Sequence, residues 1–311
     1  MKHSFRDVDF NQLAEFWNGC YPERYRIDPD LIRLKTVACP TFDWGASGVE
    51  VADGEILGFV IVKKSSANLY SGPDKDTAHL GAIAFREAEY GVDLLADVKR
   101  LLRNRGLNRL VFGADSGHFF PGCPTDAPQL QGFLMVEGFE ATGEQVDLER
   151  DLTDYQNPYA PPEGDEHRRL TDADVNSLNA FLEREFPGRW RHDVMRQVEV
   201  QGAPTVFGLL RDGKVEGFAL LQDGDQREPI GGAIWRNDLG ANWGSLGPIG
   251  VSKHLRGKGS GHALLGAALE SLRDRGARRT IIDWTTLVDF YGRHGFEPTR
   301  RYRSLALRLG E

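Results

Sequence analysis

Cysteine is scarce in this chain of 311 residues, and long apolar runs are missing altogether. The three cysteines, Cys20, Cys39 and Cys123, are odd in number and far apart, so they match neither a disulfide framework nor a metal-ligand spacing. No run reaches the roughly 18 apolar residues of a membrane-spanning helix, and the first residues lack the apolar core of a signal peptide. We therefore expect a cytoplasmic protein with reduced thiols, no metal and no membrane partner.

Positive charge is also in short supply. Lys and Arg number 38 against 46 Asp and Glu, which gives a formal net charge of −8. A nucleic acid is held by an excess of positive charge on one face of its partner. We therefore expect no nucleic-acid partner, and the composition says nothing about the oligomeric state.

What the chain does contain is a long-range repeat. Its length suggests about two domains of roughly 150 residues each, and similar segments recur in the same order in both halves, which indicates a duplication. The clearest pairs are Asp53–Phe59 with Asp212–Phe218, Arg86–Gly91 with Arg256–Gly261, and Leu130–Glu140 with Leu287–Glu297.

Each half follows one order of predicted elements: helices, hairpin strands, a strand, a glycine loop, a helix, a strand, a short helix and a last strand. That order predicts an α+β (α/β layered) fold, in which a mixed, mostly antiparallel sheet is flanked by helices. Residues 155–164 are rich in Pro and Asn and have no periodicity, which is typical of a linker. We place the boundary near Pro161 and predict domains at 1–158 and 163–311.

A glycine-rich loop between a strand and a helix is the strongest local signal in the second half. Glycine accepts positive φ and lets a ligand approach the backbone, and the free amides at a helix N-terminus attract an anion such as a diphosphate. A dinucleotide-binding loop would need a third glycine where His262 stands. The residues expected to hold the anion are Arg256, Gly257, Lys258, Gly259, Ser260 and Gly261.

Two motifs in this half resemble the GNAT N-acetyltransferase superfamily. Arg-x-x-Gly-x-Gly, beginning at Arg256 with Val251 five residues earlier, is similar to the family's acyl-CoA loop. The run 290–296 (FYGRHGF) resembles its closing signature, and the tandem layout resembles mycothiol synthase and related two-copy members. The resemblance implies two tandem GNAT-like domains, acetyl-CoA as co-substrate, and N-acetyl transfer to a small-molecule amine by direct attack on the thioester.

The resemblance also implies roles for single residues. The strand backbone at Ile249, Gly250 and Val251 is expected to pair with the pantetheine arm and to polarise the thioester carbonyl. Tyr291 is expected to be the general acid that protonates the departing thiolate. Trp284 stands where the family often has Asn, seven residues before this Tyr.

The general base and the acceptor site stay open. The segment Phe186–Trp190 either borders the acceptor or packs a helix end. Each of four side chains is a candidate base, and a surface or capping role is the ordinary alternative for each. These four are Asp283, Glu185, His192 and Asp238.

The first half departs from the motifs at two positions. Glu89 replaces the middle glycine of the loop, where a carboxylate repels a diphosphate, and Leu134 stands at the position of the expected acid. We therefore expect 1–158 to be a degenerate domain with a structural or acceptor-cleft role, and 163–311 to carry the chemistry. The extra residues 113–120 either line that cleft or form a plain surface loop.

Three other functions are weighed against this one. A non-catalytic acyl-CoA-binding or sensor module would need the glycine loop but not Tyr291. An acetyltransferase of a peptide or protein amine would use the same site on a larger acceptor. An interaction protein with two dead sites is disfavoured by the intact loop.

Overall fold

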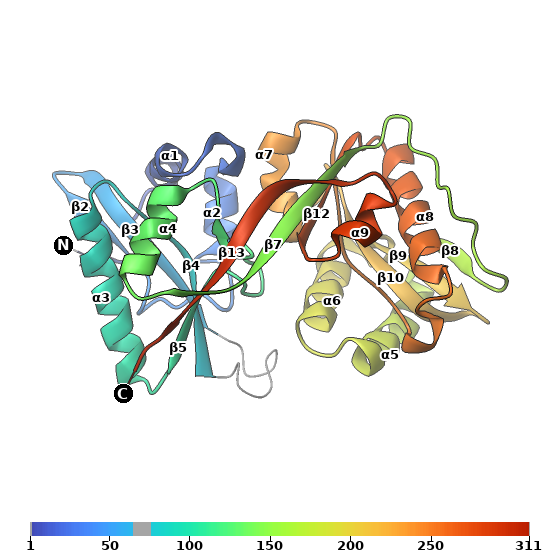
Figure 1. Ribbon diagram of the computed structural model, residues 1–311, viewed down its shortest axis with the longest axis horizontal. Coiled ribbons are helices and arrows are strands. Elements are labelled where there is room, and N and C mark those ends of the chain that lie inside the picture. Colours follow the sequence, from blue (N-terminus) through green and yellow to red (C-terminus); the bar gives the residue numbers. More distant parts are fainter. Residues whose placement is uncertain (1, 65–75, 311) are drawn as a thin grey trace. The chain divides into compact units, whose positions relative to one another are not determined.

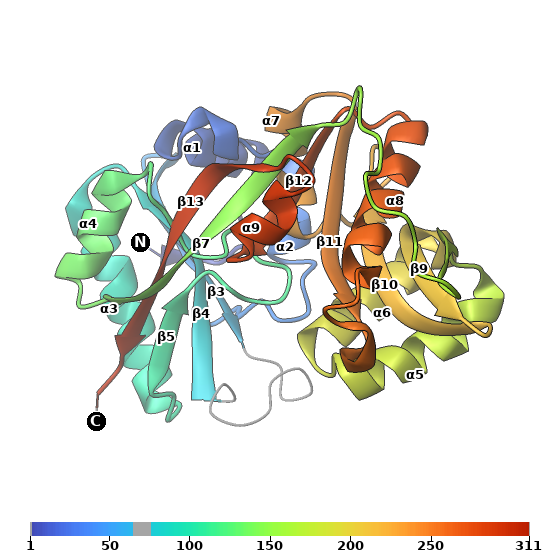
Figure 2. The same cartoon turned by 45° about the vertical axis from the view of Figure 1, so that its right-hand side comes forward.

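The computed structural model describes residues 2–64 and 76–310. The chain packs as two compact units: unit 1 comprises Met1–Val146 and Arg300–Glu311, and unit 2 comprises Asp147–Thr299. Each unit is a mixed sheet flanked by helices, so the predicted α+β class is confirmed (Figures 1 and 2).

The sheet of unit 1 runs in the order β1, β2, β3, β4, β5, β13. Neighbouring strands are antiparallel except β4 and β5, which are parallel. The strands are β1 Lys2–His3, β2 Gly48–Ala52, β3 Glu55–Lys64, β4 Thr77–Phe85, β5 Arg109–Phe112, β6 Cys123–Pro124, β7 Glu140–Asp151 and β13 Glu297–Arg308. The helices are α1 Phe10–Cys20, η1 Glu23–Tyr25, α2 Pro29–Lys35, α3 Ala88–Asn104 and α4 Pro128–Val136.

An aromatic core lies between α1 and the sheet of unit 1. The Trp17 ring stacks on Phe59 of β3 and on Phe120, with centroids 5.8 and 5.7 Å apart. Asp9 caps α1 by accepting a hydrogen bond from the backbone N–H of Asn11 at 2.8 Å. Buried aromatic side chains dominate core energetics, so these rings fix the helix on the sheet.

The extra residues 113–120 belong to this core. Phe119 and Phe120 are fully buried. Asp115 forms a buried ion pair with Lys63 of β3, and the Nζ–Oδ2 distance is 2.8 Å. The segment is therefore buried and held by an ion pair, so it is not a plain surface loop.

The sheet of unit 2 runs β12, β11, β10, β9, β8, and the end of β7 lies beside β12. All of these neighbours are antiparallel except β11 and β12, which are parallel. The strands are β8 Glu166–Arg169, β9 Val206–Arg211, β10 Lys214–Gln222, β11 Trp243–Val251 and β12 Arg279–Thr285. The helices are η3 Asp172–Asp174, α5 Val175–Glu185, α6 Arg189–Gln201, η4 Ala203–Thr205, η5 Gly231–Trp235, α7 Arg236–Leu239, η6 Lys253–Leu255, α8 Ser260–Asp274 and α9 Val288–Gly292.

The units divide at other residues than the predicted linker. Residues 147–158 pack in unit 2, and residues 300–311 pack in unit 1. The reason is strand pairing: β13 continues the sheet of unit 1 by pairing Ala306 with Val111 and Leu307 with Leu110. Strand partners far away in the sequence, rather than the Pro-rich segment, set the limits of each unit.

The Pro-rich segment itself lies along α8 within unit 2 (Figures 1 and 2). The backbone N–H of Asn157 donates to Glu270 Oε1 at 3.0 Å, and its side-chain amide donates to the Ala263 carbonyl at 3.4 Å. Gly266 faces Asn157 directly, so a Cβ at this position would collide with that amide. The segment that looked like a free linker is thus a strap, which we call the connector (residues 152–165).

Candidate active site

The predicted glycine loop joins β11 to α8 in unit 2. Gly257 and Gly259 have φ of +74° and +90°, the left-handed region in which a Cβ is strained. A Cβ on Gly257 would meet nothing within 4 Å, and one on Gly259 would meet only Pro162, at 4.0 Å. The backbone of the loop therefore lies open to a ligand.

The N-terminus of α8 suits an anion. Gly259 is its N-cap and supplies no side-chain hydrogen bond. The first backbone N–H groups of the helix, at the positive end of its dipole, are therefore available to a ligand. The Ser260 hydroxyl is buried and has no hydrogen-bond partner in residues 2–64 and 76–310. Arg256 and Lys258 are exposed beside it. Open glycines, an orphan hydroxyl and two cations fit a diphosphate.

The strand before the loop is opened on one side. β11 pairs with β12 from Trp243–Arg279 to Ser245–Ile281, and in the described residues this pairing goes no further although both strands continue. The N–H of Ser252 donates to Glu216 on the opposite neighbour, β10, at 2.9 Å. Because strand backbone groups alternate in direction, the N–H groups of Ile249 and Val251 point to the open side.

Neighbouring residues shape this open edge. Arg256 Nε donates to the Val251 carbonyl at 3.3 Å, which ties the loop to the strand. The Phe186 ring lies directly on Gly250, so that any Cβ there would collide with it. Phe186 stacks on Trp190, with centroids 5.1 Å apart. The aromatic segment that the sequence singled out therefore packs against the strand.

Tyr291 lies on α9 and is buried. Its ring packs edge-on against Phe290 at 5.0 Å, and its hydroxyl has no hydrogen-bond partner among the described residues. Burial, and second the negative charge of Asp283, raise the pKa of Tyr291 well above its usual value. The phenol is therefore protonated at neutral pH and able to donate its proton.

Asp283 lies where β11 and β12 separate. A Cβ on Gly231 would be 2.7 Å from its Oδ1, and one on Gly247 would be 3.5 Å away. Two glycines thus make room for this carboxylate between η5 and the opened strand. Its charge also acts on Tyr291, so it lies near both the strand and the phenol.

The other three candidate bases are engaged elsewhere. Glu185 accepts a hydrogen bond from the N–H of Lys253 at 3.1 Å. Burial acts to raise the pKa of Glu185, but its contacts with Lys253 and Arg184 outweigh burial and lower that pKa. His192 is half exposed beside Asp193, at 3.3 Å. Asp238 lies 3.6 Å from Arg279. Of the four candidates, Asp283 is the one that lies beside Gly231 and Gly247, where β11 and β12 separate.

Trp284, at the position where Asn was expected, has a different environment. Its φ is +49°, and its N–H donates to Asp147 Oδ1 at 3.0 Å. The Arg189 guanidinium lies 4.0 Å from the centre of its ring, a cation–π contact. The tryptophan thus holds the first residue of α6 instead of offering an amide.

Sequence reasoning missed a polar network beside the loop. His262 Nδ1 lies 3.1 Å from His294 Nε2, and His294 Nδ1 lies 2.8 Å from the Tyr155 hydroxyl. Burial, His262 and Arg150 lower the pKa of His294 to about 4. The only signal in the sequence was the position of His262 directly after the glycine loop.

Unit 1 has the same opened sheet without the loop. β4 continues to Phe85 beyond its last pair with β5, Leu80–Phe112, where β5 itself ends. Only Arg86 and Glu87 join β4 to α3. The Tyr21 hydroxyl donates to the Ile83 carbonyl at 2.8 Å and occupies the open edge. Leu134, at the place of the expected acid, is buried.

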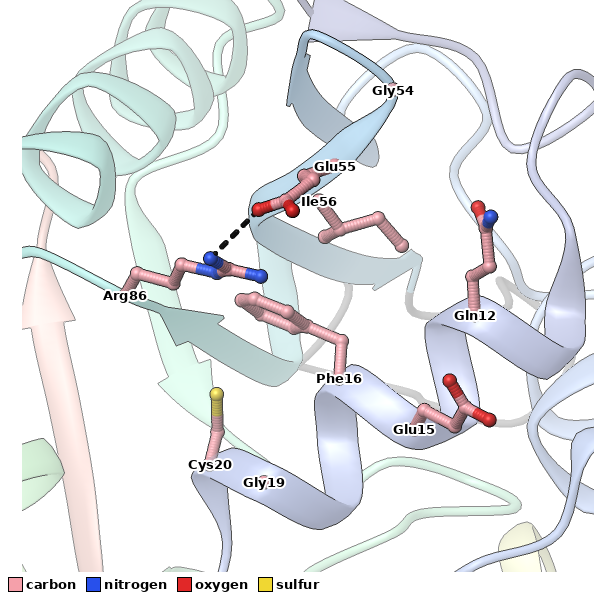
Figure 3. Close-up of a pocket in the computed structure, with 9 residues that line it drawn as sticks. All are labelled: Gln12, Glu15, Phe16, Gly19, Cys20, Gly54, Glu55, Ile56 and Arg86. Carbon is pink, nitrogen blue, oxygen red and sulfur yellow. Dashed lines mark ion pairs between the residues drawn. The ribbon is translucent and has the colours of Figure 1, made fainter.

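A pocket of about 430 Å³ lies in unit 1 between α1, the turn from β2 to β3, and Arg86 (Figure 3). Arg86 is paired there with Glu55 at 2.9 Å, and Glu15 and the ring of Phe16 also line the pocket. With two carboxylates and one paired guanidinium in its lining, this pocket does not suit an anion.

Neither a metal site nor a membrane helix is found in the part of the chain that the structure describes. No group of three or more His, Cys, Asp or Glu side chains is placed to hold a metal ion. No described helix is both long and apolar enough to cross a bilayer.

Comparison with known proteins assigns the second half to a family. Residues 175–296 match the Acetyltransferase (GNAT) family. No curated protein matches the chain.

Solved structures share the fold of the whole chain. A glucosamine N-acetyltransferase region of a fungal multi-domain GH3 beta-N-acetylglucosaminidase is 23% identical, with a TM-score of 0.82. That match covers 99% of this chain but only 38% of the fungal one. A GCN5-related N-acetyltransferase from Sphaerobacter thermophilus is 16% identical, with a TM-score of 0.72 over 100% of this chain and 96% of that one.

A tandem GNAT protein from the clavulanic acid biosynthesis pathway is also 16% identical, with a TM-score of 0.70 over 100% of this chain and 98% of its own. At these identities the likeness concerns the fold. Together with the family match, it confirms the predicted tandem arrangement: residues 175–296 match the GNAT acetyltransferase family, and the chain has the fold of tandem GNAT proteins.

Proposed function

We propose that the chain is an acetyl-CoA-dependent N-acetyltransferase that acts on a small-molecule amine, with its active site in unit 2 alone. One observation carries the proposal. The opened edge of β11 runs straight into a glycine loop at the N-terminus of α8, and an unpartnered phenol on α9 lies close by. In unit 1, two residues join β4 to α3, and Leu134 stands at the position of the phenol.

The donor site is the loop and the open edge. When bound, acetyl-CoA supplies an acetyl group activated as a thioester. The amides from Gly259 to Gly261, with Arg256 and Lys258, would hold its diphosphate. The N–H groups of Ile249 and Val251 would hold the pantetheine arm, and Ile249 or its neighbour would polarise the carbonyl oxygen.

Two side chains would move protons. Asp283 would take the proton of the incoming ammonium, because its carboxylate lies at the point where the strands separate. Tyr291 would give its proton to the departing sulfur, because its hydroxyl is protonated and uncommitted. The second proton of the nitrogen would then pass to the phenolate left on Tyr291, so that direct transfer needs no covalent enzyme intermediate.

The acceptor class rests on the relatives and on the wall of the site. Two of the related structures are a glucosamine N-acetyltransferase region and a tandem GNAT protein from the clavulanic acid biosynthesis pathway, and both are consistent with a small acceptor. Phe186, Trp190 and the Arg189–Trp284 contact offer a rigid aromatic wall to such a molecule. The three free cysteines suit the reducing cytoplasm, where we place the reaction.

An amine-library screen tests the proposal. Purified protein is incubated with acetyl-CoA and each amine, and free thiol is measured. We expect thiol release with at least one small amine, and about a hundredfold less with Asp283→Asn, the lower end for loss of a general base. Binding of acetyl-CoA without turnover of any amine, peptides included, would instead support a sensor module.

A further inference from the structure

The connector reaches the donor loop. A Cβ added to Gly259 would lie 4.0 Å from the Pro162 side chain. The preceding turn is fixed by Asn157, whose Oδ1 accepts the N–H of Tyr159 at 3.0 Å. Residues 157–162 are thereby held beside the N-terminus of α8.

Tyr159 ends an aromatic stack at this place. Its ring lies 4.7 Å from His262 at an interplanar angle of 17°, and His262 lies 4.4 Å from Phe290 at 28°. The Tyr159 side chain is half-buried, and its hydroxyl has no partner within the described ranges. The stack therefore presents one partly exposed aromatic ring next to the anion loop.

A cation stands near the same stack. Arg293 follows α9, is exposed, and makes no ion pair within the residues that the structure describes. Arg293 directly precedes His294, whose Nε2 lies 3.1 Å from His262 Nδ1. Burial, and second the charge of Arg293, lower the pKa of His262. A neutral aromatic stack with one uncommitted guanidinium is suited to a flat base that carries a phosphate.

We propose that the connector is part of the donor site: Tyr159 stacks on the adenine of coenzyme A, and Arg293 pairs with the 3′-phosphate of the same nucleotide. This inference rests on the proposed function, since it assumes that the diphosphate occupies the adjoining loop. It assigns a binding role to a segment whose sequence is that of a linker.

Calorimetric titration separates the two ends of the ligand. Coenzyme A, dephospho-coenzyme A and 4′-phosphopantetheine are titrated into the full chain and its variants. Tyr159→Ala should weaken coenzyme A binding roughly tenfold, the effect of losing one base–aromatic stack, and leave 4′-phosphopantetheine unchanged. Tyr159→Phe should bind like the wild type. Arg293→Ala should weaken coenzyme A about threefold, as for an exposed ion pair, and leave dephospho-coenzyme A unchanged.

Controls keep the outcomes distinct. Arg301→Ala removes an exposed arginine of unit 1 and should change nothing. Tyr159→Ala that binds coenzyme A like the wild type, or that weakens 4′-phosphopantetheine equally, overturns the inference while the proposed function stands. A wild-type chain that binds no coenzyme A overturns both.

Discussion

Units 1 and 2 share an opened sheet and differ in what fills the opening. In unit 1 the Tyr21 hydroxyl occupies the open edge, and two residues join strand to helix. In unit 2 the N–H groups of Ile249 and Val251 face that edge, and the loop ahead of α8 carries two left-handed glycines. Both units thus have an open strand edge, which is a property of the fold. The proposed donor site also requires accessible backbone N–H groups in the loop and no side chain on the open edge.

The largest expected effect tests the chemistry of unit 2. Tyr291→Phe removes the hydroxyl and keeps the packing, so turnover should fall roughly 100- to 10,000-fold, the range for loss of positioned proton transfer. Affinity for acetyl-CoA should stay the same. Steady-state kinetics and calorimetry measure the two quantities, with Tyr90→Phe at the start of α3 in unit 1 as the matched control. An unchanged turnover number would remove Tyr291 from the mechanism.

The second prediction tests how much the buried ion pair of unit 1 stabilises the protein. Burial raises the pKa of Asp115, but the charges of Lys63, His79 and His118 outweigh it and hold this pKa below its usual value. Asp115→Ala leaves Lys63 as an unpaired buried charge and should lower the free energy of unfolding by about 3–5 kcal/mol. Urea denaturation at pH 7 measures this loss.

The same pair sets a pH dependence for unit 1. Because the folded pKa of Asp115 is depressed, its contribution is complete above the ordinary carboxyl range and is lost as the pH falls through the depressed pKa. The double change Lys63→Met with Asp115→Leu should restore most of the stability. In unit 2 the corresponding strand, β10, ends instead with the neutral Gln222, which is hydrogen-bonded to Ile230. Equal losses in the single and double variants would refute the ion-pair account.

The third prediction moves the defect of one unit into the other. Gly259→Glu copies Glu89 and places a carboxylate at the anion site in a residue with φ of +90°. Donor affinity should fall roughly 100-fold, as expected when one or two charge-assisted hydrogen bonds are lost. Gly259→Ala keeps the backbone strain without the charge and should lose less. The reciprocal Glu89→Gly should not create donor binding in unit 1, and calorimetry on both tests the comparison directly.

The smallest effect concerns the pH dependence of unit 2. The pKa of His294 is lowered to about 4 in the folded protein. As the pH falls below the ordinary value of 6.5, His294 is therefore protonated in the unfolded chain before it is protonated in the folded one. The contribution of His294 to stability should therefore be complete above pH 6.5 and decline as the pH falls toward 4. Thermal unfolding of the wild type and of His294→Gln over this range measures it, and identical slopes would contradict the assignment.

The sequence predicted those features whose conformation depends only on a few consecutive residues. The glycine loop could be predicted because positive φ and a helix N-terminus are properties of a few consecutive residues. Tyr291 was predicted from the resemblance to the closing signature of the GNAT family, and Leu134 was assigned by aligning the two halves. Asp283 could not be chosen from its rivals, because its position depends on Gly231 and Gly247, which come from other elements.

The sequence by itself determined the duplication, the α+β class, the glycine loop before α8 and the replacement of its middle glycine by Glu89 in the first half. Only the tertiary structure decided which strands complete each unit and that the Pro-rich segment is a strap on α8. Those features rest on contacts such as Tyr155 with His294, which are 139 residues apart. No local periodicity or propensity encodes such a pair, since the two side chains meet only after the sheet and α8 have packed.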